Sequence, residues 1–235
     1  MSTKPLVKYR DLGKISYHDA WSLQTKVHKS LIERKRQDAY SASSSVHELL
    51  ICEHNPVYTL GKSGKEEHLL ISDEDIKKEG FEFTKINRGG DITYHGPGQL
   101  TVYPIFDMES FFRDVHKYVR FLEEINIRVL LHYGLVGIRE EGFTGVWLEA
   151  SEAKPKRKIC AIGVHFSRWV SLHGFALNVN TNLSHFNNII PCGIAEDNKS
   201  VTSLQQELGR LVDINEVKLL IKEKAAEVFE FDYLS

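Results

Sequence analysis

Hydrophobic and polar positions along the chain follow two different periods, and each period predicts one kind of element. Alternating or continuous apolar runs predict strands over 6–9, 48–53, 81–86, 100–106, 146–148, 158–166 and 169–180. Helical spacing predicts one helix capped by Asp19 that reaches about Arg34, and a longer one from Asp107 to the residue before Gly134. The apolar stripe of the longer helix is expected to pack in the core.

Capping residues predict three further helices. Ser72 is expected to cap a short helix that Gly80 ends. Thr202 with a glutamine three positions later forms a capping-box pattern that Gly209 ends, and Asp213 opens the last helix. Residues 34–45 lose all periodicity and become rich in serine, which is typical of a loop.

The order of these elements predicts an α/β fold with a mixed β-sheet and flanking helices. Strands and helices are interspersed irregularly, without the strict alternation of parallel βαβ units. Pro104 lies within the predicted strand at 100–106, and because proline cannot donate to a ladder, this strand is expected at an edge or at a bulge.

Composition bounds the class of protein. The chain has 235 residues, of which 42% are hydrophobic and 26% charged, as in an ordinary globular protein, and one domain over 1–235 is expected. A formal net charge of −2 gives no basic field for nucleic acid or an anionic membrane.

Without an apolar signal region or a run of about 18 apolar residues, the protein is expected in the cytoplasm. Three widely spaced cysteines are expected to be free thiols.

Residues 88–99 concentrate four glycines, a proline, an arginine and a histidine directly before an apolar run. Glycines allow positive φ angles and a close approach of the backbone to a bound molecule, so this segment is a candidate ligand loop, although it could simply form a long turn. A second unusual segment favours the ligand interpretation, because Cys192 lies between Pro191 and Gly193 within residues 189–194.

Together with residues 158–163 and 172–180, these segments resemble the octanoyltransferases of lipoate biosynthesis. The similarity extends from residues 53–61 to 201–204 with the motifs in the family's order. The resemblance implies the architecture of lipoate and biotin protein ligase catalytic domains, and no cofactor or metal. It implies a transferase that takes an octanoyl or lipoyl group from acyl carrier protein. The implied acceptors are the lipoyl domains of 2-oxoacid dehydrogenases and the glycine cleavage H protein.

Acyl transfer from a thioester to an amine requires a nucleophile that attacks a thioester, holds the acyl group and leaves again. A thiolate meets these needs, but a free cysteine has a pKa of about 8.5 and needs a positive neighbour to ionise at neutral pH. A lysine can supply that charge and later accept the proton of the incoming amine. The resemblance assigns these catalytic roles to Cys192 and Lys158. Their separation of 34 positions (192 − 158) does not itself establish contact, and a solvated lysine and a small buried cysteine are the alternatives.

Cys160 is a rival thiol. If residues 158–166 form a regular strand, Lys158 and Cys160 lie on the same face, roughly 6–7 Å apart. The family match and the position of Cys192 between proline and glycine favour Cys192, where backbone N–H groups could meet a developing oxyanion. Cys160 is expected to pack in the core.

The resemblance also implies an acyl pocket lined by small side chains and backbone. Tyr94 and His95 are expected to orient the carbonyl or to hold the loop. The expected lining residues are Arg88, Gly89, Gly90, Asp91, Ile92, Thr93, Tyr94, His95, Ala161, Ile162, Gly163, Gly174, Phe175 and Ala176.

Three alternatives remain at this stage. The first is an ATP-dependent lipoate or biotin ligase on the same fold, for which Cys192 would be unnecessary. The second is a carrier-binding module that uses the basic loop at 154–158, whose plainer interpretation is a solvated hairpin tip. The third is a metal site, which the absence of CxxC and HxxxH pairs disfavours.

Overall fold

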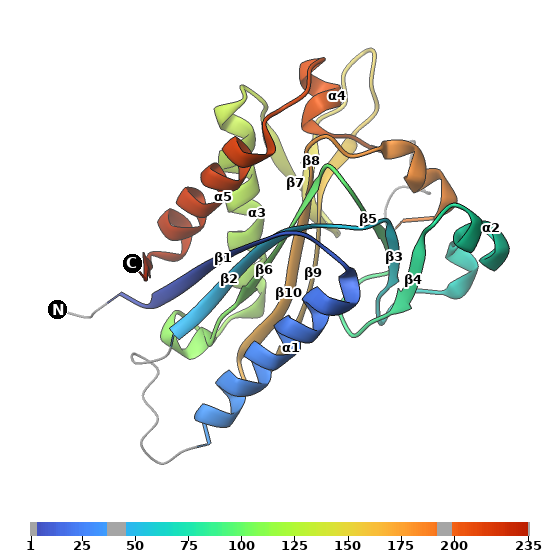
Figure 1. Ribbon diagram of the computed structural model, residues 1–235. Coiled ribbons are helices and arrows are strands. Elements are labelled where there is room, and N and C mark those ends of the chain that lie inside the picture. Colours follow the sequence, from blue (N-terminus) through green and yellow to red (C-terminus); the bar gives the residue numbers. More distant parts are fainter. Residues whose placement is uncertain (1–3, 37–45, 192–198, 235) are drawn as a thin grey trace.

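The computed structural model describes residues 4–36, 46–191 and 199–234, and its largest element is a mixed β-sheet (Figure 1). In the described residues this main sheet has the order β12-β1-β2-β6-β10-β9-β8-β7, with β11 beside β9. β12 and β2 run parallel to β1, and the ladders from β2 through to β7 are antiparallel. Its strands are β1 (Leu6–Ile15), β2 (Val46–His54), β6 (Gln99–Ile105), β7 (Gly137–Glu140), β8 (Phe143–Leu148), β9 (Arg157–Ser167), β10 (Val170–Asn178), β11 (Ser200–Val201) and β12 (Asp232–Tyr233).

The central strands bury both faces, and their side chains alternate between two clusters. In β2, Leu49 and Ile51 belong to the main core, while Leu50 and Cys52 belong to a second cluster. This is the period of two expected of a strand. Helices α3 (Val115–His132) and α5 (Ile214–Phe229) cover the face with the main core, and α1 (Tyr17–Arg34) covers the other (Figure 1).

The helix predictions hold in position but differ at three N-termini, of which α1 and α3 shift the most. α1 is capped by Ser16, whose hydroxyl accepts from the backbone N–H of Asp19, so Asp19 lies in the first turn. α3 begins after Asp114 and not at Asp107, which instead caps a short 3₁₀ turn at Met108–Ser110. Asp107 and Asp114 both present a capping carboxylate, and tertiary packing of the aromatic residues between them separates the two turns.

The short helices follow their capping residues. α2 (Asp73–Lys78) is capped by Ser72, and Gly80 after it has a φ of 73°. α5 is capped by Asp213 as predicted. α4 (Leu204–Leu208) ends at Gly209, but its N-cap is Ser203, one residue after the predicted position. α2 lies beside a small sheet of order β4-β3-β5, formed by β3 (Val57–Leu60), β4 (Glu82–Lys85) and β5 (Ile92–His95).

Pro104 was expected at an edge or at a bulge, and the edge position is wrong. β6 lies in the interior of the main sheet, between β2 and β10. The ladder with β10 ends at Val102, so the missing N–H of Pro104 breaks no pair on that side. Gly174 of β10 makes room here, because a Cβ on it would lie 2.8 Å from the Pro104 ring. The Ser171 hydroxyl donates to the Pro104 carbonyl at 2.8 Å.

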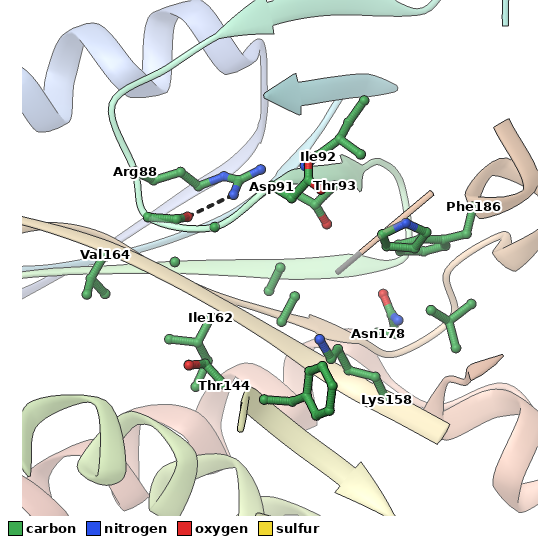
Figure 2. A pocket seen from close by; sticks show the side chains of 18 of the residues that line it. Arg88, Asp91, Ile92, Thr93, Thr144, Lys158, Ile162, Val164, Asn178 and Phe186 are labelled. Carbon is green, nitrogen blue, oxygen red and sulfur yellow. Dashed lines mark hydrogen bonds between the residues drawn. The ribbon is translucent and has the colours of Figure 1, made fainter. Parts of the chain in front are cut away.

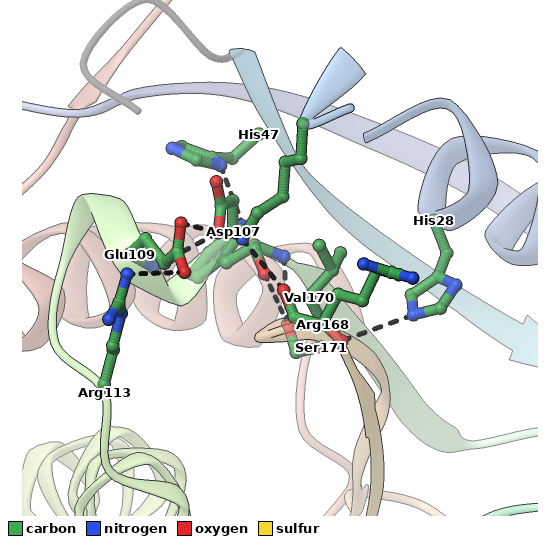
Figure 3. Close-up of polar contacts among 10 residues, drawn as sticks. His28, His47, Asp107, Glu109, Arg113, Arg168, Val170 and Ser171 are labelled. Carbon is green, nitrogen blue, oxygen red and sulfur yellow. Dashed lines mark hydrogen bonds and ion pairs between the residues drawn. The ribbon is translucent and has the colours of Figure 1, made fainter. Parts of the chain in front are cut away.

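A polar cluster around the buried side chain of Asp107 lies where α1 ends (Figure 3). The Lys35 ammonium donates to Asp107 Oδ1 at 2.6 Å and to the Arg168 carbonyl at 2.8 Å, and lies 3.2 Å from Glu109 Oε2. The Asp107 side chain is fully buried, and its backbone N–H donates to His47 Nδ1 at 3.1 Å. Burial lowers the pKa of His47 to about 4, so this imidazole is neutral. We call these five residues the Asp107 cluster.

The architecture is therefore mixed α/β, with helices on both faces of a mixed sheet, as the sequence predicts. Within the residues that the structure describes, no helix is both long and apolar enough to cross a membrane.

Candidate active site

A cavity of about 390 Å³ opens between the small sheet and the main sheet (Figure 2). Residues 88–93 form its upper wall in this view, and β9 crosses beneath them. We call it the Lys158 cavity. It is lined by Arg88, Gly89, Gly90, Asp91, Ile92, Thr93, Gln99, Val119, Gly142, Phe143, Thr144, Lys158, Ala161, Ile162, Gly163, Val164, Ala176, Asn178, Phe186, Pro191 and Val201.

Arg88 fastens the glycine loop to the small sheet. Its guanidinium donates to the carbonyl of Thr59 at 2.6 Å and to the Gly89 carbonyl at 3.0 Å, and the residue is only 8% exposed. Gly89 N–H donates to the Val164 carbonyl of β9 at 3.0 Å. A Cβ on Gly163 would lie 2.9 Å from the Gly89 carbonyl oxygen. Glycine therefore lets this loop approach β9 closely and seals the cavity wall.

Asp91 holds the other end of the loop. One carboxylate oxygen accepts from the backbone N–H of Ile92 at 2.7 Å, and the other pairs with His68 Nδ1. The Asp91 side chain is 6% exposed. The carbonyl of His68 accepts from the N–H of Ile190 at 2.8 Å, which ties the loop to the segment that leads to Pro191.

Tyr94 and His95 hold the loop and do not line the Lys158 cavity. The Tyr94 hydroxyl lies 2.7 Å from His185 Nδ1, in an aromatic cluster on the small sheet. His95 Nδ1 lies 2.7 Å from Gln99 Oε1. Since an amide oxygen only accepts, this nitrogen carries the proton. Burial, with His54 nearby, lowers the pKa of His95 to about 3, so the ring is neutral.

Gly174 and Phe175 also lie outside the Lys158 cavity. With His95 they line a second, smaller cavity of about 50 Å³. It shares with the first cavity Arg88, Thr93, Ala161, Ile162, Gly163 and Ala176. His173 lines it as well, and burial next to Arg88 lowers the pKa of His173 to about 3. The other expected lining residues, from Arg88 to Thr93 with Ala161, Ile162, Gly163 and Ala176, all line the Lys158 cavity.

Lys158 reaches the cavity because of a β-bulge. Lys158 pairs with Trp147 and Cys160 pairs with Val146, so β9 has one residue more than β8 between the two pairs. Paired residues share a face and consecutive residues of a strand do not, so Lys158 and Cys160 lie on opposite faces. The expectation of a shared face is wrong for this reason.

Cys160 packs in the core, as predicted. It is fully buried in the main cluster with Val146 and Ile159. Burial, with Glu123 nearby, raises the pKa of the Cys160 thiol well above its usual value. A thiol that stays protonated at neutral pH is a poor nucleophile.

Cys192 lies outside the described residues. Pro191, which precedes it, lines the Lys158 cavity together with Lys158.

The basic loop is paired within the chain. Arg157 donates to both carboxylate oxygens of Glu207, at 2.6 and 2.7 Å, and Lys154 Nζ lies 3.2 Å from the same group. Lys156 Nζ lies 2.7 Å from Glu140. Docking of an acidic carrier on this loop would have to compete with these ion pairs.

Several lining residues were not predicted. Phe143 and Thr144 come from β8, Phe186 comes from the segment after β10, and Val201 comes from β11. Asn178 lies within the motif at 172–180 and could have been found there. In the described part of the chain, no group of three or more His, Cys, Asp or Glu side chains could hold a metal ion.

Sequence comparison places the chain among known acyltransferases. The model of the lipoyl protein ligase A/B catalytic domain matches residues 16–226. An octanoyltransferase of Cytophaga hutchinsonii is 48% identical over 235 residues, which is 97% of this chain and 95% of the relative. One of Flavobacterium johnsoniae is 50% identical over 228 residues, covering 95% and 97%. This chain belongs to the octanoyltransferase family. It is therefore an acyltransferase of protein lipoylation.

Solved structures show the same fold at low identity. A bipartite lipoate protein ligase of Thermoplasma acidophilum superimposes with a TM-score of 0.71 at 18% identity, over 100% of this chain and 87% of that one. The biotin protein ligase of Aquifex aeolicus gives a TM-score of 0.52 at 13% identity, over 95% and 70%. The predicted likeness to lipoate and biotin ligase catalytic domains is confirmed.

Proposed function

We propose that this octanoyltransferase moves an octanoyl group from acyl carrier protein to one lysine of a lipoyl domain, through a thioester on Cys192. Lys158 is the proposed partner of that thiol. We assign the activity to residues 1–235 acting as one domain. The observation that carries the mechanism is the shared lining of one cavity by Lys158 and Pro191, the neighbour of Cys192.

The first half-reaction loads the enzyme. The Cys192 thiolate attacks the carbonyl carbon of the donor thioester, a new C–S bond forms, and the bond to the carrier's sulfur breaks. The carrier leaves as a thiolate that takes a proton from solvent. A positive Lys158 favours the ionised form of Cys192 before attack, because an opposite charge nearby lowers the pKa of a thiol.

The second half-reaction unloads it. The amine of the acceptor lysine attacks the Cys192 thioester, a C–N bond forms, and the C–S bond breaks to regenerate the thiolate. The amine must lose a proton in this step. Once the thiolate has been acylated, the ammonium of Lys158 loses the anion that favoured it, so Lys158 can give up its proton and act as the base.

The cavity suits a saturated chain. Ile162, Val164, Phe186 and Val201 give it apolar walls, and Ala161 and Ala176 leave room between them. A chain without hydrogen-bonding groups binds through burial, at about 0.8 kcal/mol for each methylene, or roughly 5 kcal/mol for the six methylenes of octanoate. A lipoyl group, which has the same carbon backbone, is a second possible cargo.

We propose the lipoyl domains of 2-oxoacid dehydrogenases and the glycine cleavage H protein as acceptors, in agreement with family membership. We also propose a cytoplasmic location. Cys52 and Cys160 are free thiols in the structure, which suits a reducing compartment.

Intact-mass spectrometry after mixing the enzyme with octanoyl-acyl carrier protein tests the mechanism. We expect one octanoyl adduct that peptide mapping assigns to Cys192, and its loss when a lipoyl domain is added. Cys192→Ser should abolish transfer while the protein remains folded. Parallel mixtures of free octanoate and lipoyl domain, with and without ATP, should yield no modified domain.

Three outcomes would contradict the proposal. An adduct on Cys160 would make Cys160, and not Cys192, the nucleophile. ATP-dependent use of free octanoate would make the enzyme a ligase. Transfer at the wild-type rate by Cys192→Ser would remove the thioester from the mechanism.

A further inference from the structure

Trp147 lies directly opposite Lys158 across the β8–β9 ladder. The Lys158 ammonium nitrogen is 4.6 Å from the centroid of the indole ring, within the range of a cation–π interaction. Trp147 is fully buried, while Lys158 lines the cavity. The indole therefore forms a fixed support for an amine at the cavity wall.

The backbone two residues before Trp147 is closely packed against β9. Gly145 has a φ of 125°, and a Cβ on it would lie 2.5 Å from the Cys160 carbonyl oxygen. Its N–H donates to the buried Glu123 carboxylate at 3.2 Å. The bulge between this ladder's pairs turns Lys158 onto the face of Trp147. Local strand geometry thus brings the ring and the amine together.

A second cation shares the same aromatic surface. Lys199 Nζ lies 4.1 Å from the Phe143 centroid and 5.7 Å from the Trp147 centroid. It also lies 3.3 Å from Glu140, so a carboxylate balances its charge. The centroids of the two rings are 6.2 Å apart, and Trp147 faces both ammonium groups whereas Phe143 faces that of Lys199.

Hydrogen bonding by the indole N–H does not account for a tryptophan at position 147. Trp147 Nε1 is buried and has no hydrogen-bond partner among the described residues. A buried tryptophan usually satisfies this donor, and leaving it unsatisfied is costly. An aliphatic residue would fill the core without that cost. What only an aromatic residue provides here is a ring face for ammonium groups, and Lys158 lies nearer to that face than Lys199 does.

We propose that Trp147 is a positioning residue for acyl transfer, which holds the Lys158 amine at the cavity wall through its ring face. The inference rests on the proposed role of Lys158. A lysine side chain has many rotamers, and a reacting group held in place raises the rate of an otherwise poorly oriented step. Loss of the ring face should therefore lower the catalytic rate constant more than it raises the KM of the donor.

Fluorinated tryptophans test this without changing the shape of the site. Each ring fluorine withdraws charge from the indole face and weakens its attraction for a cation. The enzyme would carry Trp21→Phe and Trp169→Phe, so that Trp147 alone is labelled. We expect kcat to fall stepwise with one, two and three fluorines, by about tenfold in all, with KM changed less than about twofold. A flat series would overturn the inference.

Substitutions give a second measure. Trp147→Phe, which keeps a ring face, should retain most of kcat, and Trp147→Leu should lose about tenfold or more. Tyr9→Leu is the matched control. The Tyr9 ring centroid lies 4.9 Å from Lys222 Nζ, and neither residue lines the cavity. It should leave kcat unchanged. Equal loss in Trp147→Phe and Trp147→Leu would assign Trp147 a packing role only.

The same assays separate this inference from the proposed function. If octanoyl transfer proceeds through Cys192 and the fluorine series is flat, only the role of Trp147 is refuted. If no octanoyl adduct forms on Cys192 in the unfluorinated enzyme, the proposed function fails, and the inference fails with it. Thermal unfolding of each variant verifies that the compared proteins are folded.

Discussion

Lys35 and Lys158 place ammonium groups in two different kinds of surroundings. In the Asp107 cluster, Lys35 meets two carboxylates and a carbonyl at 2.6–3.2 Å, and its side chain is 8% exposed. Lys158 lies on an indole face at the wall of a 390 Å³ cavity. Lys35 is therefore buried among acceptor groups that it holds together, whereas Lys158 lies where a ligand in the cavity could reach its ammonium group.

The largest effect should come from removing the cavity cation. Lys158→Met keeps most of the length of the side chain without its amine, and we expect octanoyl transfer to fall by about 10²–10⁴, the usual contribution of a general base. Unfolding should change little, because the residue lies at a cavity wall. Single-turnover transfer and urea unfolding would measure both, with Lys222→Met as the control. Nearly wild-type transfer by Lys158→Met would show that Lys158, like Lys35, has no direct part in the reaction.

Breaking the Lys35–Asp107 pair should lower stability and leave transfer nearly unchanged. Asp107→Asn leaves the Lys35 ammonium buried without its nearest anion, and we expect a loss of about 3–5 kcal/mol in the free energy of unfolding. Transfer per folded molecule should stay within about twofold. Glu48→Gln, which breaks a half-exposed pair with Arg10 at 3.1 Å, should cost less than about 1 kcal/mol. A large loss of activity in folded Asp107→Asn protein would show that the Asp107 cluster influences the Lys158 cavity.

Glu207 provides an intermediate case, because it pairs with Arg157, the neighbour of Lys158. Burial opposes its ionisation, but hydrogen bonds from Arg157, Thr202 and Lys154 outweigh burial and lower the pKa of Glu207 to about 2, from an ordinary 4.5. A lowered pKa in the folded state contributes stability above about pH 5 that is lost as pH falls towards 2, here up to about 3 kcal/mol.

Urea unfolding of wild type and Glu207→Gln at pH 7, 5 and 3 measures this contribution. We expect the difference in free energy of unfolding to be greatest at pH 7 and to shrink at pH 3. A difference independent of pH would mean that Glu207 acts by packing alone.

The smallest effect should come from the core thiol. Cys160→Ser buries a hydroxyl in the main core and should cost about 1–3 kcal/mol of stability. Transfer should remain within about twofold of wild type, because Cys160 does not line the cavity. Steady-state assays and thermal unfolding would measure both. Complete inactivity of a folded Cys160→Ser protein would make Cys160 the nucleophile.

Sequence patterns located most elements because their causes are local. Ser72, Gly80, Gly209 and Asp213 act on backbone groups within one turn, so each was found at its predicted place. The resemblance likewise identified the loop at 88–95 and Lys158 from contiguous motifs, and Lys158 and residues 88–93 of that loop line one cavity.

Other expectations depended on neighbours that are distant in sequence. Pro104 was expected at an edge or at a bulge, yet β6 lies inside the sheet between β2 and β10. The sheet tolerates the proline on the β10 side because that ladder ends at Val102. Tyr94 and His95 belong to the same motif as Thr93 but are held by His185 and Gln99 behind the loop.

By itself, the sequence determined the family, the mixed α/β class and the segments that carry the chemistry, because motifs and caps are properties of short stretches. Only the tertiary structure decided which face of β9 each residue occupies. Regular alternation would join Lys158 to Cys160, but the bulge opposite Val146 and Trp147 separates them. A single extra residue in one ladder reverses the side on which a side chain lies, and that residue is set by how two strands pair.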